Sequence, residues 1–245
     1  MDKPRFFACE SDKSGNKIII KDEENIHLRS ALRLQIGDEV EVFFGNGIID
    51  ECVIDSVGKK ESVLRLVKEK VEPKDKLQVT LFMAITKSER MDWAVQKCTE
   101  LGVSAIIPFE SKFCTAKDNP NKVDRLNRIA ISACKQSGRA YLPQIGKAIT
   151  FNQLLSDVKQ MKNVVVAYEN DSTSAKDVLS KLSGDVAIII GSEGGFSEDE
   201  INQLALNGAK VISLGKNILR AETAAVALSS VVLYQLNFWK REKNE

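Results

Sequence analysis

Two glycine-containing segments in the second half of the chain hold the residue types that could build a ligand site. One is Gly191-Ser192-Glu193-Gly194-Gly195-Phe196, and the other runs from Leu214 to Thr223. Glycine permits positive φ and lets backbone approach a ligand closely. An arginine is disfavoured at a helix N-terminus, so Arg220 in the second segment has another role. We expect the two segments to form one ligand site.

The acidic residues around the first segment decide which ligand suits this site. Glu193 is followed by Glu198, Asp199 and Glu200, and this negative charge would repel a phosphate even at a helix N-terminus. No Lys-Ser or Lys-Thr pair follows the glycines, which excludes a P-loop, and the GxGxxG fingerprint of dinucleotide-binding loops is also missing. A neutral or cationic ligand with a hydrogen-bonding edge fits better, and S-adenosylmethionine is one. The alternative is a simple strand-to-helix turn at the glycines.

Alternating strands and helices must position both segments. Continuous apolar runs such as Val186–Ile190 are typical of parallel strands buried on both faces. The predicted strands are Gln78–Ile85, Ala105–Phe109, Asn163–Tyr168, Val186–Ile190 and Lys210–Leu214. The predicted helices are Glu89–Leu101, Lys122–Ser137, Phe151–Val158, Ser174–Leu182, Glu198–Leu206 and Glu222–Trp239. Residues 77–245 therefore form an α/β domain, in which ligands bind beyond the carboxyl ends of the strands.

Residues 1–70 follow a different pattern. Short strands joined by glycine turns predict a small β-barrel or sandwich. The predicted strands are Lys17–Ile20, Glu39–Phe44, Ile48–Val57 and Ser62–Val67, with one helix at Glu23–Leu34. The stretch at 71–76 is charged, contains a proline and has no apolar periodicity, so we place the linker there.

Composition narrows the functional class. The chain has 245 residues, of which 43% are hydrophobic and 28% charged, as in ordinary globular proteins. No apolar run is long enough for a membrane span, and no signal peptide is expected. Five cysteines without a close pair and a single histidine provide no metal-ligand set and favour a reducing cytosol. We expect a cytoplasmic protein without a metal. The net charge of +1 means that any nucleic-acid partner would need a local basic face.

Three further motifs accompany the two glycine segments. They are His27–Arg33, Lys87–Val103 and Ala133–Arg139, the last followed by Pro143. Together with the glycine segments they resemble the SPOUT class of RNA methyltransferases, and most closely the RsmE family of 16S ribosomal RNA (uracil-N3) methyltransferases. The resemblance covers nearly the whole chain in order. With the two glycine segments counted as one motif, four motifs together are far more specific than any one of them.

The resemblance implies features of the fold that periodicity does not reach. It implies a PUA-like amino-terminal domain that binds RNA, which agrees with the small β-barrel. It also implies a carboxy-terminal trefoil knot in a mostly parallel sheet, and a homodimer packed through the knotted domain. The chain departs from the family pattern in three places. Ser192 stands where a proline is common, Lys216-Asn217 is less basic than in relatives, and Lys112 stands where an arginine is frequent. The last two bear on individual RNA contacts.

By the same resemblance, S-adenosylmethionine lies among the three loops that follow Tyr168, Ile190 and Leu214. The implied cofactor-binding residues are Tyr168, Gly191, Glu193, Gly194, Gly195, Leu214, Gly215, Ile218, Leu219 and Ala224. Uracil N3 carries a proton, so the enzyme must stabilise negative charge on the base, remove the proton, or both. Arg220 is the candidate for stabilising the charge, and Glu222 or Glu193 for removing the proton. Helix capping and loop hydrogen bonding are equal alternatives for the two glutamates.

The implied partner is 16S ribosomal RNA in the assembled 30S subunit. The residues expected to contact RNA are His27, Arg29, Arg33, Lys87, Arg90, Arg125, Arg128 and Arg139. A solvated helix face is the alternative for each of them, and His27 could also pack inward. Two other functions stay open at this point. One is a catalytically silent RNA-binding factor in ribosome assembly, and the other is a SPOUT enzyme that acts on tRNA or on a ribose 2′-hydroxyl.

Overall fold

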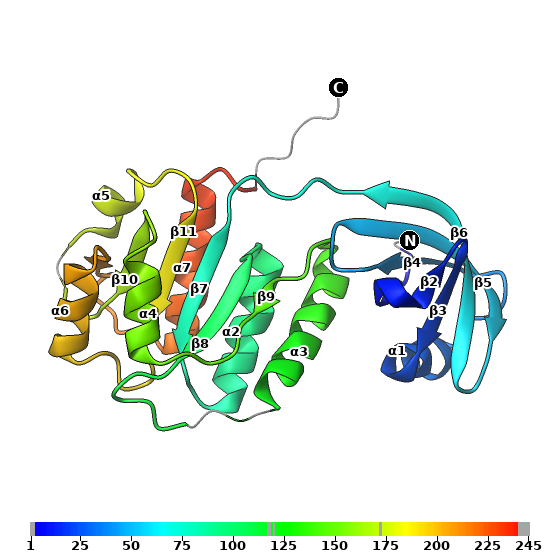
Figure 1. Cartoon of the computed structure of the whole chain (residues 1–245), viewed down its shortest axis with the longest axis horizontal. Coiled ribbons are helices and arrows are strands. Elements are labelled where there is room, and N and C mark those ends of the chain that lie inside the picture. The colour runs from blue at the N-terminus through cyan, green and yellow to red at the C-terminus, as the bar shows by residue number, and fades with distance from the viewer. Residues whose placement is uncertain (1–2, 117–118, 120, 172, 240–245) are drawn as a thin grey trace. The chain divides into compact units, whose positions relative to one another are not determined.

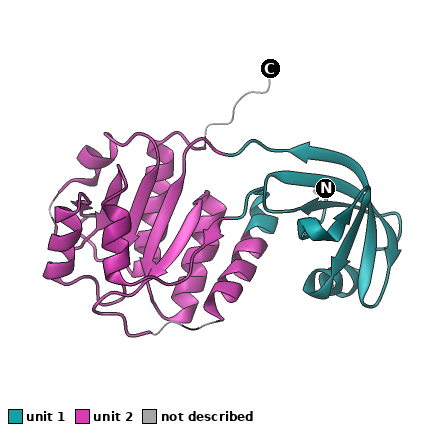
Figure 2. Ribbon diagram, in the orientation of Figure 1, with its two compact units in different colours: residues 1–74, 134–142 teal, residues 75–133, 143–245 magenta. Residues whose placement is uncertain are grey.

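The computed structural model describes residues 3–116, 119, 121–171 and 173–239. The chain divides into two compact units, which Figure 2 colours separately. Unit 1 consists of residues 1–74 and 134–142, and unit 2 of residues 75–133 and 143–245. The segment 134–142 lies far along the chain from the rest of unit 1, and neither composition nor periodicity indicated that it belongs there.

Unit 1 is built on a six-stranded sheet with the order β1-β4-β5-β6-β3-β2. Its strands are β1 (Arg5–Phe7), β2 (Lys13–Ser14), β3 (Lys17–Lys21), β4 (Glu39–Phe43), β5 (Ile48–Val57) and β6 (Glu61–Val71), with a short 3-10 turn, η1 (Glu10–Asp12). Two register shifts between β5 and β6 bend this long pair, since a bulge increases local twist. The sheet curls around a core that includes Phe6, Val40 and Leu64.

The helical segment of unit 1 differs from the prediction. It begins with α1 (Asp22–Ile26) and continues as a π-helix, η2 (His27–Ala31), so it ends three residues before the predicted end at Leu34. The reason is Arg33, whose φ of 54° lies in the left-handed region where an α-helix cannot continue. Asn25 is buried and accepts a hydrogen bond from the Ser62 hydroxyl at 2.6 Å, which ties this segment to the sheet.

Residues 134–142 join unit 1 through backbone contacts as well as side chains. The Leu142 N–H donates to the Gly45 carbonyl at 3.0 Å, and the Tyr141 hydroxyl donates to the Glu72 carbonyl at 2.9 Å. A Cβ at Gly45 would lie 2.6 Å from the Leu142 side chain. Gly45 therefore admits this close approach in addition to making the turn between β4 and β5.

Unit 2 contains six parallel strands in the order β12-β10-β11-β7-β8-β9. The strands are β7 (Val79–Ala84), β8 (Ala105–Phe109), β9 (Gln144–Ile145), β10 (Val164–Ala167), β11 (Val186–Ile190) and β12 (Lys210–Ile212). This confirms the parallel sheet predicted from the continuous apolar runs. The two-residue β9 was not predicted, because so short a strand leaves no periodicity.

Helices cover both faces of this sheet (Figure 1). They are α2 (Ser88–Leu101), α3 (Lys122–Ser137), α4 (Phe151–Val158), α5 (Ala175–Leu179), α6 (Glu198–Leu206) and α7 (Ala221–Gln235). Residues of α2, α3 and α7 share one core with Leu81 and Met83 of β7, whereas α4 and α6 share another with Phe82 and Ala84. The alternation of β7 thus divides the core between the two faces.

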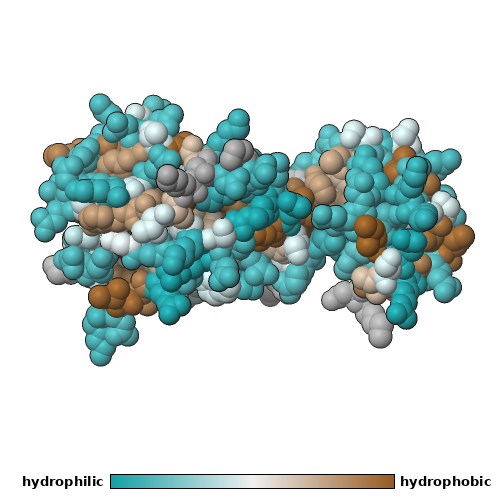
Figure 3. All heavy atoms as spheres, turned by 90° about the horizontal axis from the view of Figure 1, so that it is seen from below, coloured by the Kyte–Doolittle hydropathy of each residue, from teal (hydrophilic) through white to brown (hydrophobic). Residues whose placement is uncertain are grey.

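The surface is that of an ordinary globular protein. Figure 3 shows hydrophilic side chains over most of one face, with apolar side chains gathered in small separate patches. Within the described residues, no helix has the length and apolarity required to cross a membrane.

Candidate functional site

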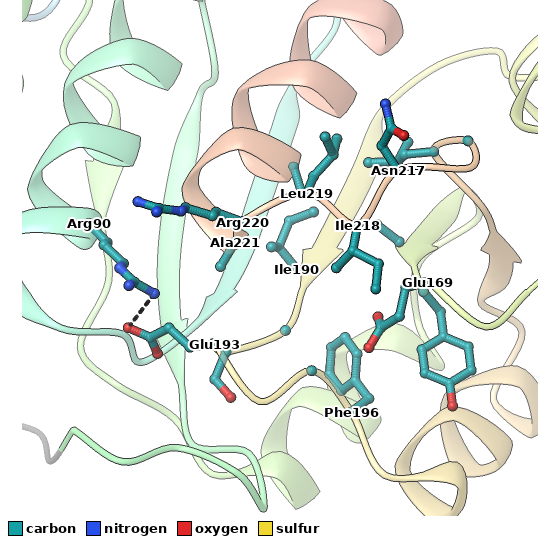
Figure 4. A pocket seen from close by; sticks show the side chains of 18 residues that line it. Arg90, Glu169, Ile190, Glu193, Phe196, Asn217, Ile218, Leu219, Arg220 and Ala221 are labelled. Carbon is teal, nitrogen blue, oxygen red and sulfur yellow. Dashed lines mark ion pairs between the residues drawn. The ribbon is translucent and has the colours of Figure 1, made fainter.

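A cavity of about 230 Å³ lies at the carboxyl ends of three strands in unit 2 (Figure 4). The sheet order places β10 between β12 and β11, so the loops that follow these strands come together. The loop after β10 contributes Tyr168 and Glu169, and the other two loops contribute the glycine segments. Arg90, near the start of α2, also lines the cavity. The two segments singled out in the sequence therefore do meet at one site.

The first glycine segment is a tight turn. The Gly195 N–H donates to the Ser192 carbonyl at 3.0 Å, and Gly195 has a φ of 68°. A Cβ at Gly195 would lie 2.7 Å from an oxygen of Glu169, and one at Gly191 would lie 3.0 Å from the Phe196 ring. Larger residues at these two positions would therefore strain the turn or push side chains into the cavity.

Glu193 is held from two sides at the cavity wall. Its Oε1 accepts a hydrogen bond from the Lys87 N–H at 3.1 Å and lies 3.3 Å from the Arg90 guanidinium. Its Oε2 is buried and has no hydrogen-bond partner. Figure 4 shows the ion pair at one end of the cavity, with the Arg220 side chain extending toward the same end. One carboxylate oxygen is thus fixed by the protein, and the other is buried without a hydrogen-bond partner in the protein.

The negative charge at the cavity comes only in part from the acidic residues that the sequence suggested. Glu200 is buried, and its carboxylate accepts hydrogen bonds from the Ser197 N–H at 2.9 Å and the Lys112 N–H at 2.8 Å. Of the four acids first considered, only Glu193 lines the cavity, so assigning Glu198, Asp199 and Glu200 to it was wrong. Glu169 supplies the second carboxylate, which points into the cavity in Figure 4. Because Glu193 is paired with Arg90, the argument against a phosphate ligand now rests on Glu169.

The second glycine segment supplies apolar walls and an arginine. Leu214, Ile218 and Leu219 line the cavity together with Ala224 of α7. Arg220 is the residue that precedes α7, and its side chain makes no capping hydrogen bond. Its guanidinium is therefore free of a helix-capping role, as expected from its unfavourable placement in the helix dipole.

The lining residues can be compared with the sequence prediction. Those of the predicted cofactor and catalytic residues that line the cavity are Tyr168, Gly191, Glu193, Gly195, Leu214, Gly215, Ile218, Leu219, Arg220 and Ala224. Gly194 and Glu222 are not among the lining residues. Sequence reasoning missed Glu169 and assigned Arg90 to RNA alone. It did not name Phe196 and Asn217 as cofactor-binding residues, although both lie in the two glycine segments. The position of Glu169 just beyond an apolar strand was a signal that could have found it.

The basic residues expected at RNA are spread over both units. His27 and Arg29 are exposed on the helical segment of unit 1, where the neighbouring Leu28 is buried, and Arg33 is exposed just after the segment ends. In unit 2, Lys87 and Arg128 are exposed. Arg139 is half-buried in unit 1.

Arg125 has a partner inside unit 2. Its guanidinium lies 2.5 Å from the Asp92 carboxylate, which links α3 to α2. Burial raises the pKa of Asp92, although the Arg125 charge acts in the opposite direction. An arginine at position 125 is therefore explained by its ion pair with Asp92, besides any contact with RNA.

Neither a reactive cysteine nor a metal centre is indicated among the described residues. Burial raises the pKa of Cys52 and Cys98 to about 12 and that of Cys134 to about 11, which leaves these thiols protonated near neutral pH. Among the described residues, no group of three or more His, Cys, Asp or Glu side chains could hold a metal ion.

Comparisons with known proteins define the class. Residues 73–233 match the family described as RNA methyltransferase domain, and residues 20–67 match the RNA methyltransferase PUA domain. The resemblance to RNA methyltransferases and the expectation of a PUA-like domain are thereby confirmed.

Individual relatives define the family within this class. The ribosomal RNA small subunit methyltransferase E of Rickettsia conorii is 35% identical over 91% of this chain and 91% of its own length. That of Bacillus subtilis is 31% identical over 88% of this chain and 89% of its own length. The chain belongs to the ribosomal RNA small subunit methyltransferase E family.

Solved structures agree with this assignment. The structure of the Neisseria gonorrhoeae ribosomal RNA small subunit methyltransferase E bound to S-adenosyl methionine matches with a TM-score of 0.85 and 28% identity, covering 96% of this chain and 98% of that one. A Legionella pneumophila protein in complex with the bound cofactor SAM matches with a TM-score of 0.88 and 29% identity over the same shares of the two chains.

Proposed function

We propose that this protein methylates N3 of a uridine in 16S ribosomal RNA, with S-adenosylmethionine as the methyl donor and the assembled 30S subunit as substrate. The observation that carries the proposal is the cavity itself. It combines apolar walls, two carboxylates and two arginines at the carboxyl ends of β10, β11 and β12. Family membership and the cofactor-bound relatives support the same activity.

The cavity fits this cofactor by its chemistry. Leu214, Ile218 and Leu219 provide apolar surface for an adenine, and Gly191 and Gly195 bring backbone groups close to its edge. Glu169 suits a cationic ligand and would repel a phosphorylated one. When bound, S-adenosylmethionine supplies an electrophilic methyl group on a sulfonium.

The protein's own residues have the task of preparing the uracil. Arg220 would stabilise the negative charge that develops on the base as the N3 proton leaves. Glu193 is the better candidate for receiving that proton, since it lines the cavity and its Oε2 has no hydrogen-bond partner. Glu222 also has a buried oxygen without a hydrogen-bond partner, but it is not a lining residue. Arg90 and the Lys87 N–H would then hold Glu193 in place.

The remaining features follow from the family. We propose that His27, Arg29 and Arg33 bind RNA from the PUA-like domain, while Lys87, Arg128 and Arg139 neutralise further phosphates. A ribosomal substrate makes the cytoplasm the expected site of action. We also propose that the carboxy-terminal domain contains a trefoil knot and that the protein forms a homodimer through this knotted domain.

The test uses 30S subunits from a strain that lacks the gene. These are incubated with the protein and S-adenosylmethionine, and the digested RNA is analysed by mass spectrometry, with naked 16S RNA and tRNA as parallel substrates. We expect 3-methyluridine on the 30S subunit. If a folded protein binds the cofactor in calorimetry but makes no 3-methyluridine, the proposed reaction is wrong. Absence of cofactor binding would instead favour a silent assembly factor.

A further inference from the structure

An exposed aromatic ring stands beside the glycine turn. Phe113 belongs to the segment that follows β8, and 42% of its surface is exposed. The base of its side chain is nevertheless packed, because a Cβ at Gly194 would lie 2.8 Å from the Phe113 Cβ. Gly194 has no positive φ, so this close approach is the reason for glycine at that position. The turn and Phe113 are thus in direct contact.

Hydrogen bonds fix Phe113 relative to the turn. The N–H of the preceding residue, Lys112, donates to Glu200 at 2.8 Å, and Glu200 also caps α6 through Ser197. The N–H of the following residue, Cys114, donates to the Ser111 carbonyl at 3.1 Å. Phe113 is therefore held in place on both sides, so its exposed ring is presented to solvent by an ordered backbone.

The chemistry beside the ring is that of a nucleic-acid contact. The Lys112 ammonium lies 5.8 Å from the centroid of the Phe113 ring. An aromatic face with a neighbouring cation is the combination that binds unpaired RNA, since the ring stacks on a base and the cation neutralises a phosphate. Gly194 adjoins Glu193, whose carboxylate lines the cavity. Phe113 consequently contacts the residue next to the one expected to meet the target uracil.

We propose that Phe113 is a stacking platform for a base adjacent to the target uridine, with Lys112 neutralising the phosphate of that nucleotide. The adjacent base is the occupant because Phe113 contacts the turn but does not line the cavity. This inference rests on the proposed function, since it requires an RNA substrate. It assigns to Phe113 a part in selecting and positioning the RNA strand, and none in binding the cofactor.

The test compares three variants with the wild type on 30S subunits. Phe113→Ala removes the ring but keeps the Cβ that packs on Gly194, and Phe113→Trp retains an aromatic face. Leu206→Ala is the matched control, because Leu206 is 86% exposed at the end of α6 away from the turn. Loss of one stacked base should raise KM for the 30S subunit by about fivefold to about 150-fold in Phe113→Ala. Phe113→Trp and Leu206→Ala should stay near the wild-type value, and cofactor affinity by calorimetry should be unchanged in all three.

Two results would overturn the platform. One is a wild-type KM for the 30S subunit in Phe113→Ala. The other is a raised KM that is also found in Phe113→Trp, or that is accompanied by weaker cofactor binding. Ultraviolet crosslinking of the protein to 30S subunits, read by mass spectrometry, gives an independent measurement. A nucleotide adduct on the peptide that contains Phe113 supports the platform even where the methylated position is another one. Its absence from a wild-type protein that methylates 30S subunits rejects the platform and leaves the proposed function standing.

Discussion

At the scale of single residues, Arg220 has the clearest expected role. Its side chain lines the cavity and makes no capping bond, so its removal should spare the fold. We expect Arg220→Ala to lower kcat about a hundredfold to a thousandfold, the usual cost of one donor to a developing anion. Cofactor affinity in calorimetry should change little. Lys216→Ala is the control, since Lys216 is in the same loop but does not line this cavity. An equal loss in turnover and cofactor affinity would show that Arg220 binds the cofactor.

The pair Arg90 and Glu193 makes a second prediction at this scale. If Arg90 acts by orienting Glu193, then Arg90→Gln and Glu193→Gln should each lower kcat by about tenfold or more. In the double variant, kcat should fall by much less than the product of the two single-variant reductions, because the two residues act as one unit. KM for the 30S subunit should stay near its wild-type value in both single variants.

Two controls separate this role from its alternatives. Arg90→Lys should recover part of the activity, since it keeps a cation near the carboxylate, whereas a general packing defect would not respond to charge. Glu222→Gln should leave kcat near the wild-type value, because Glu222 is not at the cavity wall. Additive losses for Arg90 and Glu193, with a raised KM, would instead make Arg90 an RNA contact.

At the scale of elements, the parallel sheet was predictable because strands buried on both faces consist of continuous apolar runs. The turns were predictable because a positive φ favours glycine. Glu169 left only its position just beyond an apolar strand, because its reach into the cavity depends on which strands lie beside β10. The assignment of 134–142 to unit 1 depends on contacts with Gly45 and Glu72, more than sixty residues away along the chain. The helical segment of unit 1 ends at Ala31 because of a single backbone angle, the positive φ of Arg33.

A glycine in the turn after β11 allows two effects of a substitution to be separated: contact with Glu169 and strain in the backbone. Gly195 and Gly208 both have a positive φ, but a Cβ at Gly208 would meet open space, whereas one at Gly195 would meet Glu169 at 2.7 Å. Both Gly195→Ala and Gly208→Ala should therefore lose about 1–2 kcal/mol of stability from the left-handed backbone. Only Gly195→Ala should also weaken cofactor binding in calorimetry. Equal cofactor affinities in the two variants would mean that the position of Glu169 is unimportant.

The sheet of unit 1 should contribute to acid sensitivity through Glu51. On β5, Glu51 is paired with Lys70 of β6 and with Lys3, and these partners lower its pKa from 4.5 to about 2. A depressed carboxyl pKa stabilises the folded state above pH 4.5, and that stability is lost as the pH falls toward about 2. In Glu51→Gln, urea denaturation should be less dependent on pH within this window than in the wild type. Glu61→Gln, at the start of β6, should keep the wild-type dependence. A carboxyl titration by NMR with a midpoint near 4.5 would contradict the prediction.

At the scale of the whole molecule, the proposed dimer accounts for apolar side chains that a single chain leaves in water. Tyr234 of α7 is 73% exposed, Val231 stands one turn before it, and Ile218 is 82% exposed although it also lines the cavity. We expect a second copy to bury these three side chains and to cover the outer side of the cavity wall at Ile218. The proposed dimer would then couple the oligomeric state to the cofactor site.

Charge on this surface should separate the copies and weaken the cofactor site together. We expect Tyr234→Glu and Val231→Glu to sediment as monomers, since an unpaired carboxylate in an apolar interface is strongly unfavourable. Each should bind S-adenosylmethionine about tenfold or more weakly in calorimetry, the amount that corresponds to exposing one isoleucine side chain. Leu206→Glu, at an apolar position on α6 that is still more exposed, should remain dimeric with normal affinity. A wild-type protein that sediments as a monomer, or a monomeric variant with full cofactor affinity, would reject the dimer as a part of the site.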